Sequence, residues 1–425
     1  MPGGPSPEPS AQQTIALFDP AAVYGALGYV TGSGQVPFVG NVRLLAGPAA
    51  DTALVVVALS MQNRNLAFRR TAAGFGAAYR VELTFRQGDA VVQQARRDEQ
   101  VVVDSPADTR GAEASITYQG FIAVPTGRYR LSIVVRDLNG PGSGRYEGPF
   151  GVPRLNGPAI AAPLPVYRAT PRADRSATPD VAVNPSSTVD YGTDSLRFYV
   201  ETYGLPASSE LAMAVVDSAD RAVWAATAQL HSAAALRPLL FAIAPSRLAP
   251  GRYELKVGLA GGGVVAHAPF LVAMSGRWIV ADYGEMMSLL RYFTSADTLE
   301  RLARAPAEDR AAAWRGFWRA TDPDPATAEN EALDRYLTRL AAANELYGEE
   351  GTAGWLTDRG EAFIRLGTPD RIVDPRPGYR GRGRLIEWIY GSGHLVLRFV
   401  DQAGFGRLRL EPASRTALER VVRTR

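Results

Sequence analysis

The sequence predicts two tandem all-β, immunoglobulin-like sandwiches followed by an α+β domain, in which helices come first and an antiparallel sheet second. Three features indicate this: hydrophobic alternation of period two over the first two thirds, a strand element that occurs twice, and a change to helical periodicity near residue 284. The predicted parts are a disordered Pro-rich tail at 1–13, β-sandwich domain 1 at 14–155, a Pro/Ala/Arg-rich linker at 156–187, β-sandwich domain 2 at 188–275 and an α+β module at 280–425.

The first β region contains several short strands. Residues 54–60 read Leu-Val-Val-Val-Ala-Leu-Ser, which is typical of a buried strand. Residues 78–85 alternate with period two, a turn is expected at 86–90, and residues 128–136 alternate again. Regularly spaced short strands with little helical periodicity favour a β-sandwich.

A weak internal repeat links the two β regions. Residues 125–131 read Pro-Thr-Gly-Arg-Tyr-Arg-Leu, and residues 250–255 read Pro-Gly-Arg-Tyr-Glu-Leu. Each copy is followed by a Pro-Phe strand, at 148–152 and at 268–272. The alternative is that Pro-Gly-Arg-Tyr is only a common way to enter a strand. Between the two regions, the linker at 156–187 is expected to be an extended connector over the surface.

The last third begins with helices over 284–348. Trp314, Phe317 and Trp318 lie at i, i+3 and i+4, which gives one apolar helix face. A Pro-containing break follows, with Asp324 or Thr327 as N-cap candidates for the next helix. After Gly354 the period returns to two, and a final helix is expected near 414–422. The expected strands are 362–366, 385–390, 394–401 and 407–410.

Composition excludes several classes of function. The net charge is only +3, so nucleic acid is not an expected partner. Cysteine is absent, which excludes disulfides, thiolate metal sites and a cysteine nucleophile. No apolar run is long enough for a transmembrane helix. The Pro-rich start shows no signal peptide, so either the protein stays inside or the true start lies upstream.

Enzyme signatures are also missing from the sequence. It contains no Gly-x-x-x-x-Gly-Lys-Ser/Thr phosphate loop, no His-Glu-x-x-His zinc motif and no Gly-x-Ser-x-Gly nucleophile elbow. His231, His267 and His394 fall in different predicted elements. We therefore expect no cofactor and no metal, although a pair of carboxylates acting in a hydrolase stays open.

The C-terminal third carries an ordered set of motifs, with Gly-Trp-Leu-Thr-Asp-Arg-Gly at 354–360 as its centre. Over roughly 280–412 this set resembles the GWxTD-domain family of bacterial proteins. The resemblance implies an exported, multidomain protein with β-sandwich regions ahead of the module, and it implies no catalytic residue. The matching positions are Trp318, Asp322, Pro323, Pro325, Thr327, Asn330, Glu331, Tyr336, Arg339, Ala343, Asn344, Gly354, Trp355, Thr357, Asp358, Arg359, Gly360, Gly367, Pro369, Asp370, Trp388 and Tyr390.

Two interpretations of the central motif are open. Asp358 and Arg359 could form an ionic site with Glu331, Arg335 or Arg339, and a buried site of that kind would mark a functional cleft.

The structural alternative assigns every motif residue to local folding. Thr357 and Asp358 would bond backbone amides at a turn, Gly360 would supply a permissive backbone, and Trp355 would anchor the turn in the core. The motif would then join a helix to the antiparallel sheet.

Three further groups are candidates. Asn330 and Glu331 could be catalytic or metal-binding, or could serve the cap and dipole of a helix. Trp388, with Tyr390, could be a sugar-stacking platform or part of a core face. The third group is an arginine cluster, which could bind an anion or be a solvated loop; its members are Arg376, Arg380, Arg382 and Arg384.

The sequence leaves three hypotheses for function. The first is a non-enzymatic binding or assembly protein of the cell envelope or exterior, with a protein or polysaccharide partner. The second is a hydrolase acting on a glycan or peptide through Asp358 and Glu331. The third is anion or polysaccharide binding through the arginine cluster and Trp388.

Overall fold

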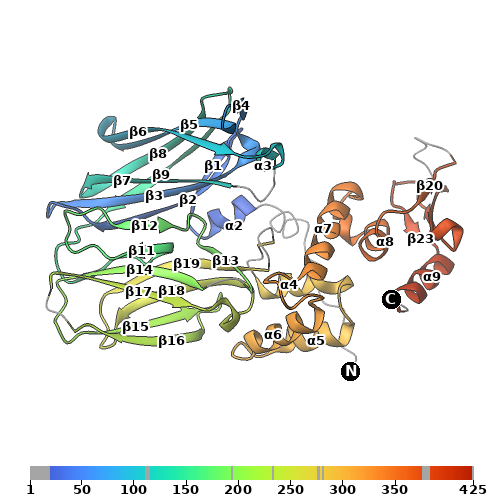
Figure 1. The fold of residues 1–425 in the computed structure, drawn as a ribbon. Helices are drawn as coiled ribbons and strands as arrows, with labels where there is room; N and C mark the ends of the chain where they lie inside the picture. Colours follow the sequence, from blue (N-terminus) through green and yellow to red (C-terminus); the bar gives the residue numbers. More distant parts are fainter. Residues whose placement is uncertain are drawn as a thin grey trace. The chain divides into compact units, whose positions relative to one another are not determined.

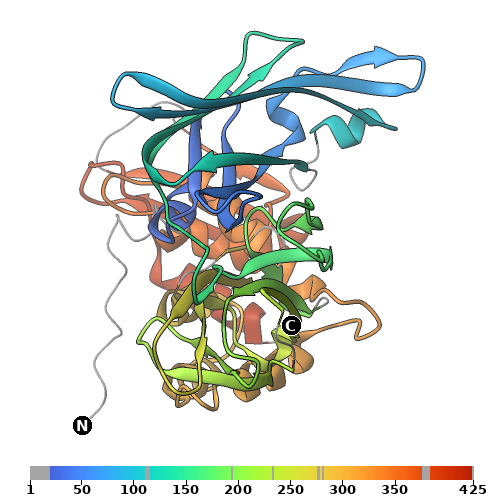
Figure 2. The ribbon, with the colours of Figure 1, turned by 90° about the vertical axis from the view of Figure 1, so that its left-hand side faces the viewer.

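The computed structural model describes residues 20–110, 115–192, 195–231, 234–274, 278–279, 282–375 and 383–423. It is mainly β, with 46% strand and 24% helix. The chain divides into two compact units, Pro20–Asp282, here called the β unit, and Tyr283–Arg425, here called the C-terminal unit. Figures 1 and 2 show the helices and strands of both units. The tail predicted at 1–13 lies outside the described residues.

The first sheet of the β unit has nine strands and curls back on itself. Its order is β4-β5-β8-β9-β1-β2-β3-β7, with β6 also paired to β5. The strands are β1 (Val30–Gly34), β2 (Phe38–Ala46), β3 (Thr52–Gln62), β4 (Arg69–Thr71), β5 (Gly74–Gln87), β6 (Ala90–Val103), β7 (Ser115–Pro125), β8 (Gly127–Asp137) and β9 (Ser143–Val152). Three short helices accompany them, α2 (Pro20–Ala26), η1 (Asn63–Asn65) and α3 (Pro106–Arg110).

The sheet bends at β1, which pairs with β2 through its first half and with β9 through its second half. Gly34 has φ +127°, and a Cβ there would overlap the Ser143 carbonyl. Glycine permits this backbone and close approach, so it marks the corner of the curled sheet.

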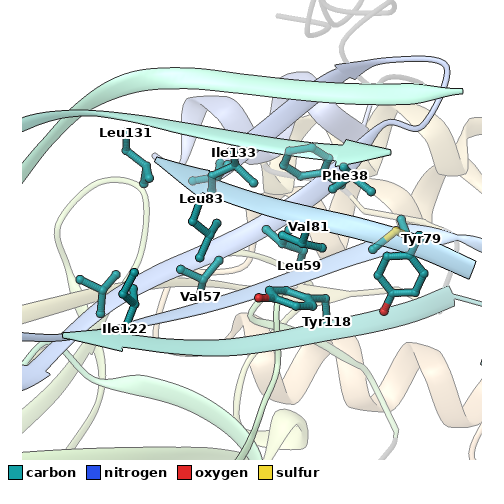
Figure 3. Close-up of a cluster of buried hydrophobic side chains, with 14 of the residues drawn as sticks. Phe38, Val57, Leu59, Tyr79, Val81, Leu83, Tyr118, Ile122, Leu131 and Ile133 are labelled. Atoms are coloured by element: carbon teal, nitrogen blue, oxygen red, sulfur yellow. The ribbon is translucent and has the colours of Figure 1, made fainter. Parts of the chain in front are cut away.

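The inside of the curl is a continuous apolar core. Val57 and Leu59 of β3 lie in it with Val81 and Leu83 of β5, and all four are fully or almost fully buried (Figure 3). Every second residue of β5 points into this core, which confirms the strand predicted at 78–85.

The other face of β3 is buried as well. Leu54, Val56 and Ala58 pack in a second core with Leu164 and Val166 of β11. Burial on both faces explains why residues 54–60 are apolar without alternation.

The linker predicted at 156–187 is wrong over much of its length. It holds β10 (Ala159–Ile160), β11 (Leu164–Thr170) and β12 (Asp180–Val183), which join the sheet of β14 (Leu196–Tyr203). The physical reason is that Leu164, Val166, Val181 and Val183 have the first sheet to pack against, so these short segments are layers of the core rather than a surface connector.

Two more sheets complete the β unit. Phe198 of β14 contacts Phe270 of β19 (Val265–Ala273) with ring centroids 5.6 Å apart, so the two sheets face each other across aromatic side chains. In the first of these sheets β17 (Leu236–Ile243) also pairs with β14. The second has the order β13 (Thr188–Asp190), β19, β18 (Gly251–Leu259), β15 (Glu210–Val216) and β16 (Ala222–Gln229), and η2 (Pro245–Arg247) precedes β18.

The predicted repeat has matching geometry in both copies. The Tyr129 hydroxyl donates to the Pro125 carbonyl at 2.9 Å, and the Tyr253 hydroxyl donates to the Ala249 carbonyl at 2.7 Å. Each bond reaches four residues back, from the start of β8 and of β18. The strand register also repeats, with Tyr129 opposite Phe150 and Tyr253 opposite Phe270.

A buried ion pair ties the first sheet to the second. The guanidinium of Arg172 donates to both carboxylate oxygens of Glu201, at 2.7 and 2.8 Å, and to the Ala46 carbonyl at 2.8 Å. The hydroxyls of Tyr199 and Tyr203 also donate to Glu201. The side chains of Arg172 and Glu201 are 1% and 0% exposed, so the full set of hydrogen bonds is what makes their burial tolerable.

The C-terminal unit has helices first and a sheet second, as predicted. The helices are α4 (Tyr283–Leu289), η3 (Leu290–Tyr292), α5 (Ala296–Arg304), α6 (Arg310–Thr321), α7 (Glu331–Leu346), η4 (Gly354–Leu356) and α8 (Asp358–Leu366). The sheet has the order β20 (Arg371–Val373), β21 (Arg384–Tyr390), β22 (Leu395–Asp401) and β23 (Arg409–Leu410); η5 (Gly391–Gly393) joins β21 to β22, and α9 (Pro412–Arg423) ends the unit.

Two local predictions fail in this unit. Residues 362–366 are the second half of α8 and not a strand, and Ala362, Phe363 and Ile364 face the core from that helix. The N-cap of α7 is Asn330, whose side chain accepts from the Leu333 amide, and not Asp324 or Thr327.

The buried ion pair generates a stability prediction. Arg172→Met leaves Glu201 buried without its counter-charge, so we expect a loss of about 3–5 kcal/mol in the free energy of unfolding. The control is Arg168→Met on β11, whose ion pair with Asp180 is 67% and 62% exposed and which should cost at most about 1 kcal/mol. Urea unfolding followed by circular dichroism measures both. Equal losses would contradict the structure.

Tyr29 generates a pH prediction. Burial raises its pKa from the ordinary 10.0 to about 12, and its hydroxyl donates to the Pro269 carbonyl. Between these values the folded state keeps the proton and the unfolded state loses it. The stabilisation is therefore complete below pH 10 and lost as the pH rises through 12, about 2–3 kcal/mol in all. The free energy of unfolding of Tyr29→Phe should fall less over that interval than that of the parent; parallel curves would count against the burial of this phenol.

Candidate functional site

The motif segment, residues 354–360, joins two helices. It follows α7, forms the single turn η4 and continues into α8. The prediction that it joins a helix to the sheet is therefore wrong, since the sheet begins only after α8.

Two glycines of the motif segment allow its backbone to pack directly against other backbone segments. A Cβ on Gly354 would lie closer than 3.0 Å to the carbonyls of Ala343 and Asn344 at the end of α7. A Cβ on Gly360 would lie equally close to the Gly354 carbonyl. Because rigid backbone, not a flexible side chain, occupies both spaces, only glycine fits at these positions.

Thr357 fastens this contact. It is fully buried and is the N-cap of α8, accepting a hydrogen bond from the Gly360 amide at 3.0 Å. Its hydroxyl donates to the Gly354 carbonyl at 2.8 Å, with the Tyr347 carbonyl also within reach at 3.2 Å. One side chain thus closes the turn and starts the helix.

Asp358 connects α8 to the end of the chain. One carboxylate oxygen accepts from the Leu410 amide of β23 at 2.6 Å, and the other pairs with Arg415 of α9 at 2.9 Å. Arg415 also reaches Glu361, one turn further along α8. The structure therefore gives Asp358 partners that the sequence interpretation did not name.

Arg359 pairs with Glu349 at 3.5 Å, and its guanidinium lies over the ring of Tyr347, 5.5 Å from the centroid. Burial lowers the pKa of Arg359, and the nearby Glu349 partly offsets this. Glu349 in turn accepts from the Leu408 amide. The predicted ionic site of Asp358 and Arg359 with Glu331, Arg335 or Arg339 is not what the structure shows.

The motif tryptophans lie in the core. Trp355 is fully buried, and the guanidinium of Arg291 lies over its ring at 5.6 Å. Trp388 is 2% exposed and contacts the rings of Tyr347 and Phe399. A sugar-stacking platform needs an exposed ring face, so the core interpretation of Trp388 fits the structure.

Asp370 and Tyr390 connect the loop before β20 to the end of β21. The Asp370 carboxylate accepts from the Gly391 amide at 2.6 Å, and the Tyr390 hydroxyl donates to the Gly367 carbonyl at 3.1 Å. Both therefore act on backbone groups between α8 and β22.

Asn330 and Glu331 start helix α7. Asn330 is buried and caps the helix, and its amide also donates to the Trp318 carbonyl. Glu331 accepts from the Thr327 hydroxyl at 2.7 Å, which holds its pKa below the ordinary value.

Helix α7 separates Glu331 from Asp358. The motif segment packs on the C-terminal end of α7, whereas Glu331 is its first residue. Sixteen residues of helix rise about 1.5 Å each, so the two carboxylates are on the order of 20 Å apart. A two-carboxylate hydrolase needs about 5–9.5 Å.

The arginine cluster is described only at one position. Arg384 pairs with Asp374 at 2.8 Å. Arg376, Arg380 and Arg382 lie outside the described residues.

A groove lies between η3, α7 and α8. Its volume is about 330 Å³, and it is lined by Tyr292, Phe293, Ala332, Arg335, Tyr336, Arg339, Ile364 and Arg365. Of the residues named as candidates from the sequence, it includes Arg335 and Arg339. Its other members were not predicted as a group, although Ala332, Arg335, Tyr336 and Arg339 have the i, i+3, i+4, i+7 spacing of one helix face.

Among the described residues, no group of three or more His, Cys, Asp or Glu side chains is placed to hold a metal ion. No helix in the described ranges is both long enough and apolar enough to cross a membrane.

The fold defines a mainly β, multidomain protein with a C-terminal unit of helices followed by a sheet. Residues 268–398 match the family model of the GWxTD domain, and the chain is therefore a GWxTD-domain-containing protein. No curated protein matches the chain.

Solved structures give only distant likenesses. A biofilm-associated protein BSP domain is 9% identical with a TM-score of 0.16, over 57% of this chain and 52% of that one. A trypsin-activated alpha-2-macroglobulin from Escherichia coli is 14% identical with a TM-score of 0.18, over 57% and 17%. A beta-glucuronidase from Bifidobacterium dentium is 13% identical with a TM-score of 0.19, over 52% and 39%. This chain spans about half the length of the first structure and less of the others.

The backbone contact at Gly354 generates a prediction. Gly354→Ala forces the motif segment away from α7, and we expect a loss of about 1–3 kcal/mol or more in the free energy of unfolding. The matched control is Gly348→Ala, where a Cβ would meet the Asn344 carbonyl at an ordinary 3.8 Å; it should change stability by less than about 1 kcal/mol. Chemical unfolding measures both. If both alanines were tolerated equally, the close backbone packing would be wrong.

Proposed function

We propose that the chain is a non-enzymatic binding or assembly protein, in which the β unit serves as spacer or recognition module and the GWxTD domain takes part in binding. The observation that supports it most is how the motif polar groups are used. Thr357 bonds to backbone at Gly354 and Gly360, and Asp358 bonds to the Leu410 amide and Arg415. These contacts favour an architectural role for the motif over a reactive one.

The β unit supports the same proposal. A tyrosine hydroxyl that bonds back to the backbone near the start of a strand is typical of immunoglobulin-like sandwiches, and both Tyr129 and Tyr253 make such a bond. On this basis we propose immunoglobulin-like character for the β regions. The envelope or exterior as the place of action, and a protein or polysaccharide as partner, are proposed from the resemblance to exported GWxTD-domain proteins.

The hydrolase alternative has less support. It requires Asp358 and Glu331 to act together, and helix α7 keeps them on the order of 20 Å apart. The alternative of anion binding through Arg376–Arg384 has one described member, Arg384, which is already paired with Asp374.

The full chain, used as bait in fractions of its source cells, tests the proposal. We expect a partner whose binding is saturable when remeasured with purified components. Asp358→Asn should lower the free energy of unfolding by about 1–2 kcal/mol, because a charged hydrogen bond and an ion pair are weakened. The control Asp297→Asn replaces an acid in the first turn of α5 and should leave stability nearly unchanged.

Enzymatic activity that depends on Asp358 would contradict the proposal. If the purified chain turns over a defined glycan or peptide, and Asp358→Asn abolishes turnover while the chain stays folded at the assay temperature, the protein is a hydrolase and the proposal is wrong.

A further inference from the structure

The groove between η3, α7 and α8 is built wholly from the C-terminal unit, and the motif contacts do not occupy it. Its long wall is one face of α7, from Ala332 to Arg339. Seven residues of helix rise about 10 Å, so the groove runs along roughly two helical turns. Its opposite wall comes from Ile364 and Arg365 of α8.

The base of the groove is aromatic and fixed in place. Phe293 contacts the ring of Tyr336 with centroids 5.0 Å apart and also contacts Phe317. The Tyr336 hydroxyl donates to the Leu289 carbonyl, which fixes the orientation of the ring, and burial raises the pKa of Tyr336. An apolar side chain of a ligand would find a preformed surface here.

The rim of the groove is positively charged. Arg365 is held over the ring of Tyr292, 5.1 Å from its centroid, and pairs with Glu361. Arg335 and Arg339 are exposed and, among the described residues, have no carboxylate within 4.0 Å. Glu361 also pairs with Arg415, so one carboxylate is shared between two arginines.

A second depression is also lined by charged side chains, but its aspartates are already paired with basic residues. It lies in the β unit, has a volume of about 390 Å³, and is lined by Asp217 and Asp220 among others. There Asp217 already pairs with Arg221, and Asp220 already pairs with Lys256. The groove differs because two of its three arginines, Arg335 and Arg339, form no ion pair within 4.0 Å among the residues described.

The spacing of the two exposed arginines indicates the shape of the ligand. Arg335 and Arg339 are one turn apart on α7, about 6 Å along the helix axis. Acidic side chains at alternate positions of an extended peptide are about 6.6 Å apart and point to the same side. Guanidinium groups bind carboxylates with two parallel hydrogen bonds. A carboxylate is therefore the favoured ligand group at both arginines.

We propose that this groove binds an extended acidic segment of a partner protein, with carboxylates at alternate positions on Arg335 and Arg339 and an apolar side chain against the half-buried ring of Phe293. The inference rests on the proposed binding function and names the site and the ligand class for it.

The test uses the full chain and a fluorescein-labelled pentapeptide with Glu at alternate positions and Leu between them. Fluorescence anisotropy should show saturable binding that weakens as salt is raised. The same peptide with Gln for Glu should bind about tenfold or more weakly. Arg335→Gln and Arg339→Gln should each weaken binding about five- to tenfold. Arg319→Gln, an exposed arginine of α6 outside the groove, should leave binding unchanged.

Any of these results would overturn the inference: no binding of the acidic peptide, equal binding of the acidic and neutral peptides, or unchanged binding by Arg339→Gln in a chain with normal thermal unfolding. Displacement by millimolar inorganic phosphate would make the groove a general anion site and would also overturn it.

The inference and the proposed function can fail separately. The double variant Arg335→Gln/Arg339→Gln is used as bait beside the parent chain. If it captures the same purified partner with the same affinity, the groove is not the binding site but the protein remains a binding protein. If the parent chain itself binds no partner and turns over a substrate, the proposed function fails.

Discussion

In the C-terminal unit, three stretches of backbone meet with no side chain between them. The end of α7, the turn at Gly354 and the start of α8 at Gly360 are in direct contact, and the Thr357 hydroxyl bonds to both sides of the joint. This contact sets the direction in which α8 returns along α7. The groove depends on that direction, because Ile364 and Arg365 face Arg335 and Arg339 only when α8 lies there.

The same joint reaches the sheet through side chains. Asp358 holds the Leu410 amide and Arg415, and Arg359 pairs with Glu349, which holds the Leu408 amide. In the β unit, Arg172 and Glu201 have a comparable role between stacked sheets. In both units, buried or half-buried charges are bonded to backbone groups of distant segments, so they determine which segments are neighbours as well as contributing to stability.

The sequence predicted most strands and helices where the hydrophobic pattern of a strand or a helix continued over enough residues to be recognised, as at Ala78–Phe85 in β5. It failed at 362–366, because a five-residue apolar run fits a buried helix face as well as a strand. It failed in the linker because β10 to β12 are short, and the surface that buries them belongs to strands about a hundred residues earlier. Thr357 and Asp358 were recognised as residues that bond backbone amides. Leu410, Arg415 and Glu349 were not predicted as partners, since tertiary contacts over such separations leave no local pattern.

Amide hydrogen exchange tests most directly whether the motif acts by holding backbone groups in place. The Gly360 amide donates to Thr357 and the Leu410 amide donates to Asp358. We predict that both exchange only on unfolding of the C-terminal unit, with protection close to that of the α7 core amides. In Asp358→Asn, the protection of Leu410 should fall while that of Gly360 is kept. Exchange of both amides within seconds in the parent chain would show that Thr357 and Asp358 do not hold these groups, and would contradict the account.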